Sequence, residues 1–375
     1  MSTRSTPTGQ GKQVVSPKNV LLYAGTILAF LIGSGFATGQ EILQYFTSYG
    51  LWGIIGTGGT VLVLMTYVCV EFIYTGRRKT FERPSLIFQY YCGKPLGVFF
   101  DYFSILFVYL SFTVMVAGAG AVFEERFGLS KFIGGIGLAV LVVGTVLFGL
   151  RGVIEVIGKL GPLIVLIAVA LGAYGVISNP GGISEGLSIL PSLEVKQASF
   201  NWFMSALSYV GFCMLWLAAF LTALGKTAQS NREAVYGGAL GGFAFSAACI
   251  IVGLGLLAHI TEVYQAEVPM LILAQHISPL LAATVSAMVL IGIMTTAVPL
   301  LWTVSSRFFQ EGTAQFKGAT ILLALLGTVI GLLLPFSAMV NLVYVINGYV
   351  GILLLLLMII KTVSRFARGS FRHSS

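Results

Sequence analysis

Ten long apolar stretches, separated by short polar or Pro/Gly-rich breaks, limit what this chain can fold into. An α-helix needs roughly 20 predominantly apolar residues to cross the hydrocarbon core of a bilayer. Charged residues make up 9% of the chain, against about 25% in soluble domains, which excludes a water-soluble fold. We therefore predict an all-α polytopic membrane protein with ten transmembrane helices. The predicted spans cover residues 20–47, 51–75, 96–123, 131–150, 153–178, 199–224, 233–259, 280–306, 318–334 and 336–360.

The basic residues predict the orientation of these spans. With the N-terminus in the cytoplasm, 18 of the 21 Lys and Arg residues fall in cytoplasmic segments, as the positive-inside rule requires. The net charge of +8 is thereby explained by topology, and no nucleic-acid partner is expected. Both termini are predicted to be cytoplasmic. Two shorter helical segments, Ser85–Cys92 and Val268–His276, are predicted to lie at the membrane surface.

Motifs typical of enzymes are missing from the sequence. Lys226 and Thr227 follow Gly225, but no glycine stands five residues earlier, so the phosphate-binding loop is incomplete. The histidines have no metal-binding spacing, and the four cysteines form no pair spaced for zinc or redox chemistry. We expect no enzymatic activity and no resident cofactor. The residues considered are His259, His276, His373, Cys69, Cys92, Cys213 and Cys249.

Ten spans divide into two sets of five, and a repeat with an odd number of spans must return in the opposite orientation. Such inverted repeats hold their substrate at the bilayer midplane, where the first helix of each half is interrupted. Residues Gly33–Gly39 contain three glycines in mid-span, and each costs a helix about 1 kcal/mol relative to alanine. Ser205–Phe212 in the sixth span is a weaker candidate. Alternatively, these small residues mark close helix packing.

A broken helix exposes backbone N–H and carbonyl groups to a ligand. We expect the backbone of the two breaks to meet the carboxylate and body of a small solute, with aromatic walls around it and polar side chains from span three. Thr113 is a further candidate in span three. The predicted substrate-binding residues are Gly33, Ser34, Gly35, Phe36, Ala37, Thr38, Tyr109, Ser111, Ser208, Tyr209, Gly211 and Phe212.

Residues 23–46, YAGTILAFLIGSGFATGQEILQYF, resemble the opening helix of the bacterial YkvI-like membrane proteins, with GSGFATGQE as the most specific part. That family belongs to the amino acid/polyamine/organocation transporter superfamily with the LeuT-type fold. The resemblance implies a 5+5 inverted repeat with broken helices 1 and 6, a pocket framed by spans one, three, six and eight, and ion-driven secondary transport across the bacterial cytoplasmic membrane. The implied units are a tail at 1–19, repeats at 20–178 and 199–361 joined by an extracellular loop at 179–198, and a tail at 362–375.

Thr295 and Thr296 are adjacent hydroxyls in the middle of the eighth span. Their resemblance to sodium-coupled members implies a Na⁺ site, completed by backbone carbonyls near Ala29 and Ile32. Alternatively, each hydroxyl bonds back to its own helix, as Ser and Thr in spans often do. Na⁺ is the one ion we expect, as the coupling ion.

Few ionisable residues lie within the spans. Glu41 is a candidate gate or proton carrier, or it faces the extracellular vestibule; Lys159 is a candidate ammonium group in the core, or it snorkels to the interface. Glu71, Asp101 and Glu155 are expected to pair with loop Arg and Lys. We therefore expect a transporter of a small neutral solute such as an amino acid, coupled to Na⁺ or H⁺. The alternative is a nutrient receptor on the same fold that does not transport, for which a separate partner chain could supply signalling; the sequence leaves a partner protein open.

Overall fold

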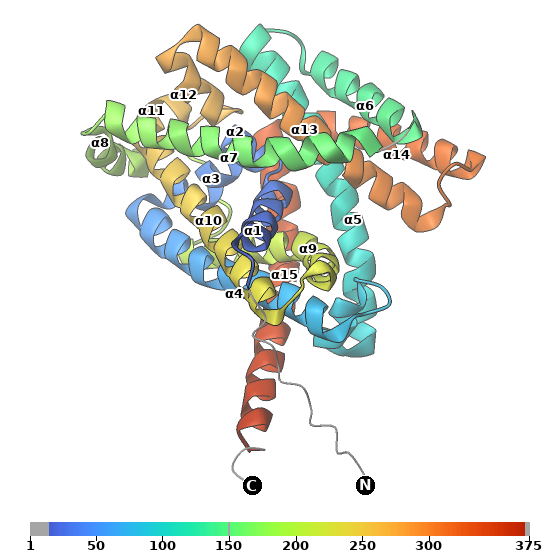
Figure 1. Ribbon diagram of the computed structural model, residues 1–375. Helices are drawn as coiled ribbons and strands as arrows, with labels where there is room; N and C mark the ends of the chain where they lie inside the picture. Colours follow the sequence, from blue (N-terminus) through green and yellow to red (C-terminus); the bar gives the residue numbers. More distant parts are fainter. Residues whose placement is uncertain (1–14, 149–150, 372–375) are drawn as a thin grey trace, which may run out of the picture.

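The computed structural model describes residues 15–148 and 151–371 and is almost entirely helical (Figure 1). Short polar or glycine-containing turns separate long apolar helices, as the sequence predicted. In chain order the helices are α1 (Pro17–Leu31), α2 (Ser34–Thr38), α3 (Gln40–Tyr45), η1 (Thr47–Tyr49), η2 (Trp52–Thr57), α4 (Gly58–Lys79), α5 (Leu86–Phe127), α6 (Lys131–Phe148), α7 (Arg151–Ser178), α8 (Gly182–Ile189), η3 (Leu190–Ser192), α9 (Trp202–Thr227), α10 (Asn231–Ala258), α11 (Ile260–Val263), α12 (Pro269–Ile277), α13 (Pro279–Phe308), α14 (Ala314–Leu333) and α15 (Phe336–Phe371).

Each predicted span overlaps one or more of these helices. Within the described residues, 7 helices are long and apolar enough to cross a membrane alone, or 8 if the bent pair Leu163–Ser178 and Gly182–Ser192 counts as one span. Two further apolar helices, Pro17–Leu31 and Lys131–Leu147, are shorter. The chain is thus a multi-pass membrane protein, and the count of ten remains a prediction.

The first predicted span consists of three helices rather than one. Ile32 and Gly33 have extended backbone conformations, so the helix stops after α1 and starts again at α2. Gly39 then adopts a left-handed conformation, with φ of 87°, between α2 and α3. This φ is readily available only to glycine. The glycines of the segment therefore lie at the points where the chain changes direction.

The break predicted in the sixth span at Ser208–Phe212 is wrong for this structure, because α9 is a single helix from Trp202 to Thr227. Gly211 instead allows α9 and α15 to approach closely: a Cβ atom on Gly211 would lie 2.3 Å from the carbonyl oxygen of Gly348. One glycine weakens a helix by only about 1 kcal/mol, which tertiary packing readily offsets. The small-residue alternative therefore describes this position.

The two predicted surface segments are helical. Leu86–Cys92 forms the first turns of α5, which bends at Gly93 (φ 74°, ψ 173°) just before Pro95. The second segment corresponds to α12. Both are too short to cross a bilayer by themselves.

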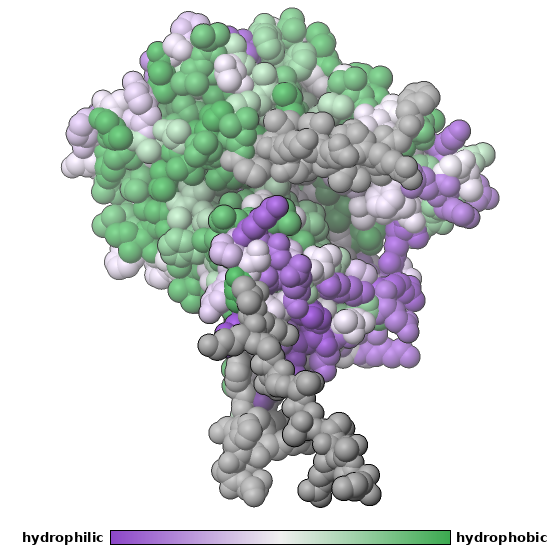
Figure 2. Space-filling view, viewed as in Figure 1, coloured by the Kyte–Doolittle hydropathy of each residue, from purple (hydrophilic) through white to green (hydrophobic). Residues whose placement is uncertain are grey.

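The outside of the helix bundle is apolar over a wide area. Figure 2 shows hydrophobic side chains over most of the upper part of the molecule and hydrophilic side chains gathered lower down. On α14, Leu322, Leu325 and Val329 are about 60% exposed, as expected for side chains that face lipid. In Figure 1, α1 lies near the middle of the bundle, and it packs on α7, α9 and α10.

Candidate functional site

Four aromatic side chains from three helices form a buried cluster beside the break in the first span. Phe107 of α5 stacks on Trp216 of α9 with ring centroids 5.4 Å apart. Phe212 of α9 stacks on Tyr344 of α15 at 4.9 Å. The Trp216 and Tyr344 rings meet edge to face at 5.7 Å. We call Phe107, Phe212, Trp216 and Tyr344 the aromatic cluster.

The helix break lies directly against this cluster. A Cβ atom on Gly33 would lie 3.6 Å from the Trp216 ring and 3.5 Å from Met115 Cε. Buried polar atoms in this region make no hydrogen bond of normal geometry with the described residues, although the Ser34 and Tyr344 hydroxyls, and those of Ser208 and Tyr45, are neighbours. These atoms are Ser34 Oγ, Tyr45 OH, Ser208 Oγ, Trp216 Nε1 and Tyr344 OH. Buried polar groups are normally paired, because an unpaired one costs about 1–3 kcal/mol. Such weakly paired polar groups beside a helix break are candidates for contact with a ligand.

Glu41 is buried inside the protein rather than facing an outer vestibule. Its side chain is 2% exposed. Its carboxylate packs against Gly35, and Tyr209 OH donates a hydrogen bond to Oε2 at 3.4 Å. Oε1 has no partner among the residues that the structure describes. Burying an ionised carboxylate without a counter-charge is costly. The Glu41 carboxyl group is therefore expected to be protonated or to bind a cation.

The predicted sodium-site residues lie partly together. Thr296 Oγ1 donates to the carbonyl oxygen of Ile32 at 3.4 Å and to that of Gly292 at 2.9 Å. Thr295 Oγ1 bonds to the Gly292 carbonyl at 3.0 Å. Ala29 is on α1, one turn before the break. Both hydroxyls therefore bond back to their own helix, as the alternative expected, and Thr296 also reaches the broken end of α1. The sodium site stays a prediction.

Several predicted site residues point elsewhere. Tyr109 OH donates to the carbonyl oxygen of Leu323 on α14. Ser111 and Thr113 bond back to their own helix, and Thr38 does the same to Ser34. The hydroxyls of span three thus do not contribute free polar atoms to the centre. Phe36 is fully buried and packs on Phe245 of α10, with ring centroids 5.6 Å apart.

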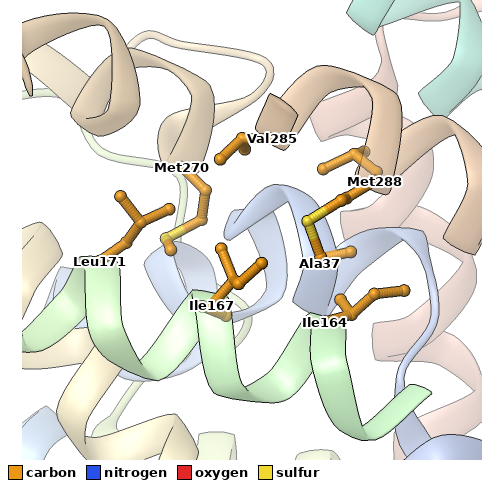
Figure 3. A pocket seen from close by; sticks show the side chains of 9 residues that line it. Ala37, Ile164, Ile167, Leu171, Met270, Val285 and Met288 are labelled. Carbon is orange, nitrogen blue, oxygen red and sulfur yellow. The ribbon is translucent and has the colours of Figure 1, made fainter. Parts of the chain in front are cut away.

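Ala37 lines a small apolar cavity (Figure 3). The cavity lies between α2, α7, α12 and α13 and has a volume of about 10 Å³, room for about one water molecule. It is too small and too apolar to hold a polar solute. The lining residues are Ala37, Ile164, Ile167, Ala168, Leu171, Met270, Val285, Met288 and Val289.

A larger crevice of about 310 Å³ lies between α5, α6, α14 and the start of α15. Charged side chains line it, namely Glu124, Lys131 and Glu267. Phe336 also lines the crevice and lies on Gly118, whose missing Cβ would be 3.1 Å from the Phe336 ring and 3.3 Å from Ser34 Cβ. Gly118 thus lies between Ser34 and Phe336, the aromatic residue of the crevice.

Hydrogen bonds fix the segment around Glu267, which lines this crevice. Ser337 donates to the Glu267 carboxylate through its backbone N–H at 2.6 Å and its hydroxyl at 2.8 Å. Lys196 Nζ donates to Ser337 Oγ at 2.6 Å. The Glu125 carboxylate accepts from the backbone N–H groups of Glu267 and Val268, just before α12. These contacts join α5, α12 and α15 on one side of the molecule.

Glu71 and Asp101 each form an ion pair with an arginine, as predicted from the sequence. Glu71 Oε2 is 3.0 Å from Arg365, and Asp101 Oδ2 is 2.7 Å from Arg307. Lys159 and Glu155 belong to the part of α7 whose side chains are outside the described residues.

Sequence reasoning missed Phe107, Trp216 and Tyr344. In an apolar span, the sequence does not distinguish an aromatic residue that faces the centre of the bundle from one that faces lipid. Trp and Tyr in membrane proteins are enriched at the interfaces. The position of Trp216 and Tyr344 in the middle of their spans, where each brings a polar atom, was therefore the available signal.

No protein-family model matches the chain. Two proteins of Bacillus subtilis (strain 168) are similar to it. The uncharacterized membrane protein YkvI is 28% identical over 258 residues, which cover 66% of this chain and 68% of YkvI. The uncharacterized protein YyaD is 25% identical over 285 residues, which cover 75% of this chain and 79% of YyaD.

Solved structures of transporters share the fold. MhsT in complex with L-phenylalanine matches with a TM-score of 0.57 and 17% identity, covering 92% of this chain and 89% of that chain. Mhp1, a nucleobase-cation-symport-1 family transporter with bound bromovinylhydantoin, matches at 0.57 and 14% identity, covering 86% and 74%. A Na⁺-coupled sialic acid symporter matches at 0.53 and 12% identity, covering 88% and 76%. The homologues of this chain are therefore YkvI- and YyaD-type membrane proteins, and its fold is that of the LeuT-type transporters.

Proposed function

We propose that the chain is a secondary transporter that moves a small neutral solute, an amino acid, by alternating access coupled to Na⁺. One observation carries this proposal: the helix break at Ile32–Gly33 lies beside buried polar atoms of Ser34, Trp216 and Tyr344 that make no hydrogen bond of normal geometry in the closed protein. The transporter fold supports it. In this proposal ten spans form two inverted repeats of five, and both termini are cytoplasmic.

The chemistry of these groups suits a zwitterion. The last carbonyls of α1 lack helical donors because the helix ends at Leu31, so they can accept hydrogen bonds from an ammonium group. Ser34, Trp216 and Tyr344 supply O–H and N–H donors for a carboxylate. An amino acid with a charged side chain would need an opposite charge in the site, and Glu41 is the one ionisable residue that we place there.

Two features support different coupling ions, and we favour Na⁺. The carbonyl of Ile32 and the hydroxyl of Thr296 are hard oxygen donors that face one another at the broken end of α1, and alkali cations prefer such ligands. Glu41 supports H⁺ as the second candidate, because a buried carboxyl without a basic partner can be protonated. Neither Lys159 nor Tyr109 is needed in this mechanism.

Alternating access then requires the broken first span to bend at Ile32–Gly33. Movement of α2 and α3 would separate Ser34 from Gly118 and let Phe336 swing away from the crevice. The contacts of Glu267 with Ser337 would break in the same step. The rings of the aromatic cluster contact one another. We therefore assign the structure to a closed state, in which a solute cannot pass from the crevice to the centre.

Accumulation in proteoliposomes tests the proposal. The purified chain is reconstituted, and uptake of radiolabelled alanine, leucine and phenylalanine is measured under an inward Na⁺ gradient, with lysine and glutamate as comparison solutes. We expect at least one neutral amino acid to accumulate above its external concentration, and collapse of the Na⁺ gradient to abolish the accumulation. Accumulation driven only by a pH gradient would replace Na⁺ with H⁺. Saturable binding without accumulation under either gradient would overturn transport in favour of a receptor.

A further inference from the structure

Two of the three histidines of the chain meet one carboxylate at the end of α10. His259 follows α10, Glu262 is in α11 and His276 is in α12. Oε2 of Glu262 is 3.3 Å from His259 Nδ1 and 2.7 Å from His276 Nδ1. The three ligand atoms lie within 4.8 Å of one another. Figure 1 shows α11 and α12 near one another at one edge of the molecule, on the side predicted to be extracellular.

A second contact fixes the orientation of the His259 ring. Its Nε2 lies 3.2 Å from the carbonyl oxygen of Gly175 on α7. A carbonyl can only accept, so Nε2 must carry the proton. In the neutral ring Nδ1 is then a bare lone pair, aimed at a carboxylate oxygen that is also an acceptor. A proton on Nδ1, which gives an ion pair with Glu262, or a metal cation between the two atoms resolves this conflict. A ring N–H held by a backbone carbonyl is the usual support of a metal-bound histidine.

We propose that His259, Glu262 and His276 bind a divalent transition-metal ion of the zinc class. Two imidazoles and one carboxylate, with a fourth position open to water, are a common zinc ligand set. Ligand atoms around tetrahedral zinc lie about 3.3 Å apart, which matches the His259–Glu262 distance of 3.3 Å. The 2.7 Å between His276 Nδ1 and Glu262 Oε2 is a hydrogen-bond distance, so the exposed His276 side chain must move outward by about 0.6 Å when the ion binds. The side chains of Glu262 and His276 are 41% and 49% exposed, so an ion from the surrounding solution can reach them.

The site would tie α12 to the rest of the bundle. Met270 of α12 lies over Gly39, where a Cβ atom would come within 2.9 Å of the Met270 side chain. Gln40 Nε2 donates to the carbonyl oxygen of Ala266, just before α12. A metal that holds His276 to Glu262 and His259 therefore stabilises the position of α12 above the outer end of the broken first span. This inference stands without the proposed transport.

Isothermal titration of the purified full-length chain with ZnCl₂, after removal of any affinity tag, tests the site. We expect one zinc ion per chain, with binding weakened more than about 10-fold by His276→Ala and by Glu262→Gln. His373→Ala is the matched control, because His373 is the remaining histidine and lies in the C-terminal tail. This control is expected to bind zinc as the unmodified chain does, and Mg²⁺ is expected not to compete.

Thermal unfolding gives a second readout that does not depend on calorimetric heats. Zinc should raise the melting temperature of the unmodified chain and of His373→Ala, but not that of His276→Ala. His276 is half exposed, so its replacement should leave the fold intact in the absence of metal. Equal zinc affinity in the unmodified chain and in His276→Ala, or no binding at all, would show that the three side chains form ion pairs only.

Discussion

The carboxylate of Glu41 lies directly on the backbone of Gly35: a Cβ atom at Gly35 would be 2.1 Å from Glu41 Oε1. The two residues belong to different segments of the broken first span, α2 and α3. The break thus allows the chain to fold back so that a charged side chain covers the glycine. A side chain at position 35 and the observed place of Glu41 exclude one another.

Gly35→Ala should therefore lower stability. The carboxylate must shift within a closely packed centre, and overpacking of this kind costs about 1–3 kcal/mol. Gly25→Ala is the matched control, because Gly25 lies on α1 with open space around its Cα. We expect a lower melting temperature for Gly35→Ala in detergent and no loss for Gly25→Ala. Equal melting temperatures for the two variants would mean that Glu41 does not occupy this place.

Thr296→Val should abolish the stabilisation of the protein by Na⁺. Valine keeps the shape of threonine but removes the hydroxyl that faces the Ile32 carbonyl. The measurement is the shift in melting temperature between NaCl and choline chloride. Thr284→Val on the same helix is the control, since its hydroxyl is exposed and bonds only to Leu280. If Thr296→Val keeps the full Na⁺-dependent shift, the predicted sodium site is elsewhere.

Much of the helix layout could be predicted because bilayer thickness fixes the length of an apolar span. The break at Ile32–Gly33 was also accessible, since the glycines that weaken the helix are local in sequence. The close packing of Gly211 against Gly348 could not be predicted, because the two residues are far apart along the chain. The directions of Tyr109 and Ser111 depend on the rotation of α5 about its axis, which a uniformly apolar helix does not encode.

Tyr344→Phe should weaken binding of the solute without lowering stability. The Tyr344 hydroxyl makes no hydrogen bond of normal geometry in this structure and has only the Ser34 hydroxyl as a weak neighbour, so its removal should cost the closed protein little, whereas a bound solute would lose a hydrogen bond of about 0.5–1.5 kcal/mol. This corresponds to a roughly 2- to 10-fold rise in Kd. Tyr109→Phe serves as the control, because its hydroxyl bonds to Leu323 away from the cluster. Affinity measured for the amino acid that accumulates in proteoliposomes should fall only for Tyr344→Phe.

Gly211→Ala distinguishes the packing role of Gly211 from a role in a helix break. The added methyl group would meet the Gly348 carbonyl at 2.3 Å, and backbone cannot move aside as a flexible side chain can. We expect a lower melting temperature, while Gly137→Ala on α6, where the space is open, should have no such effect. If α9 instead unwinds at this position to hold the solute, Gly211→Ala would leave stability unchanged and weaken binding. A fall in stability with the affinity of the remaining folded protein preserved therefore supports a continuous α9.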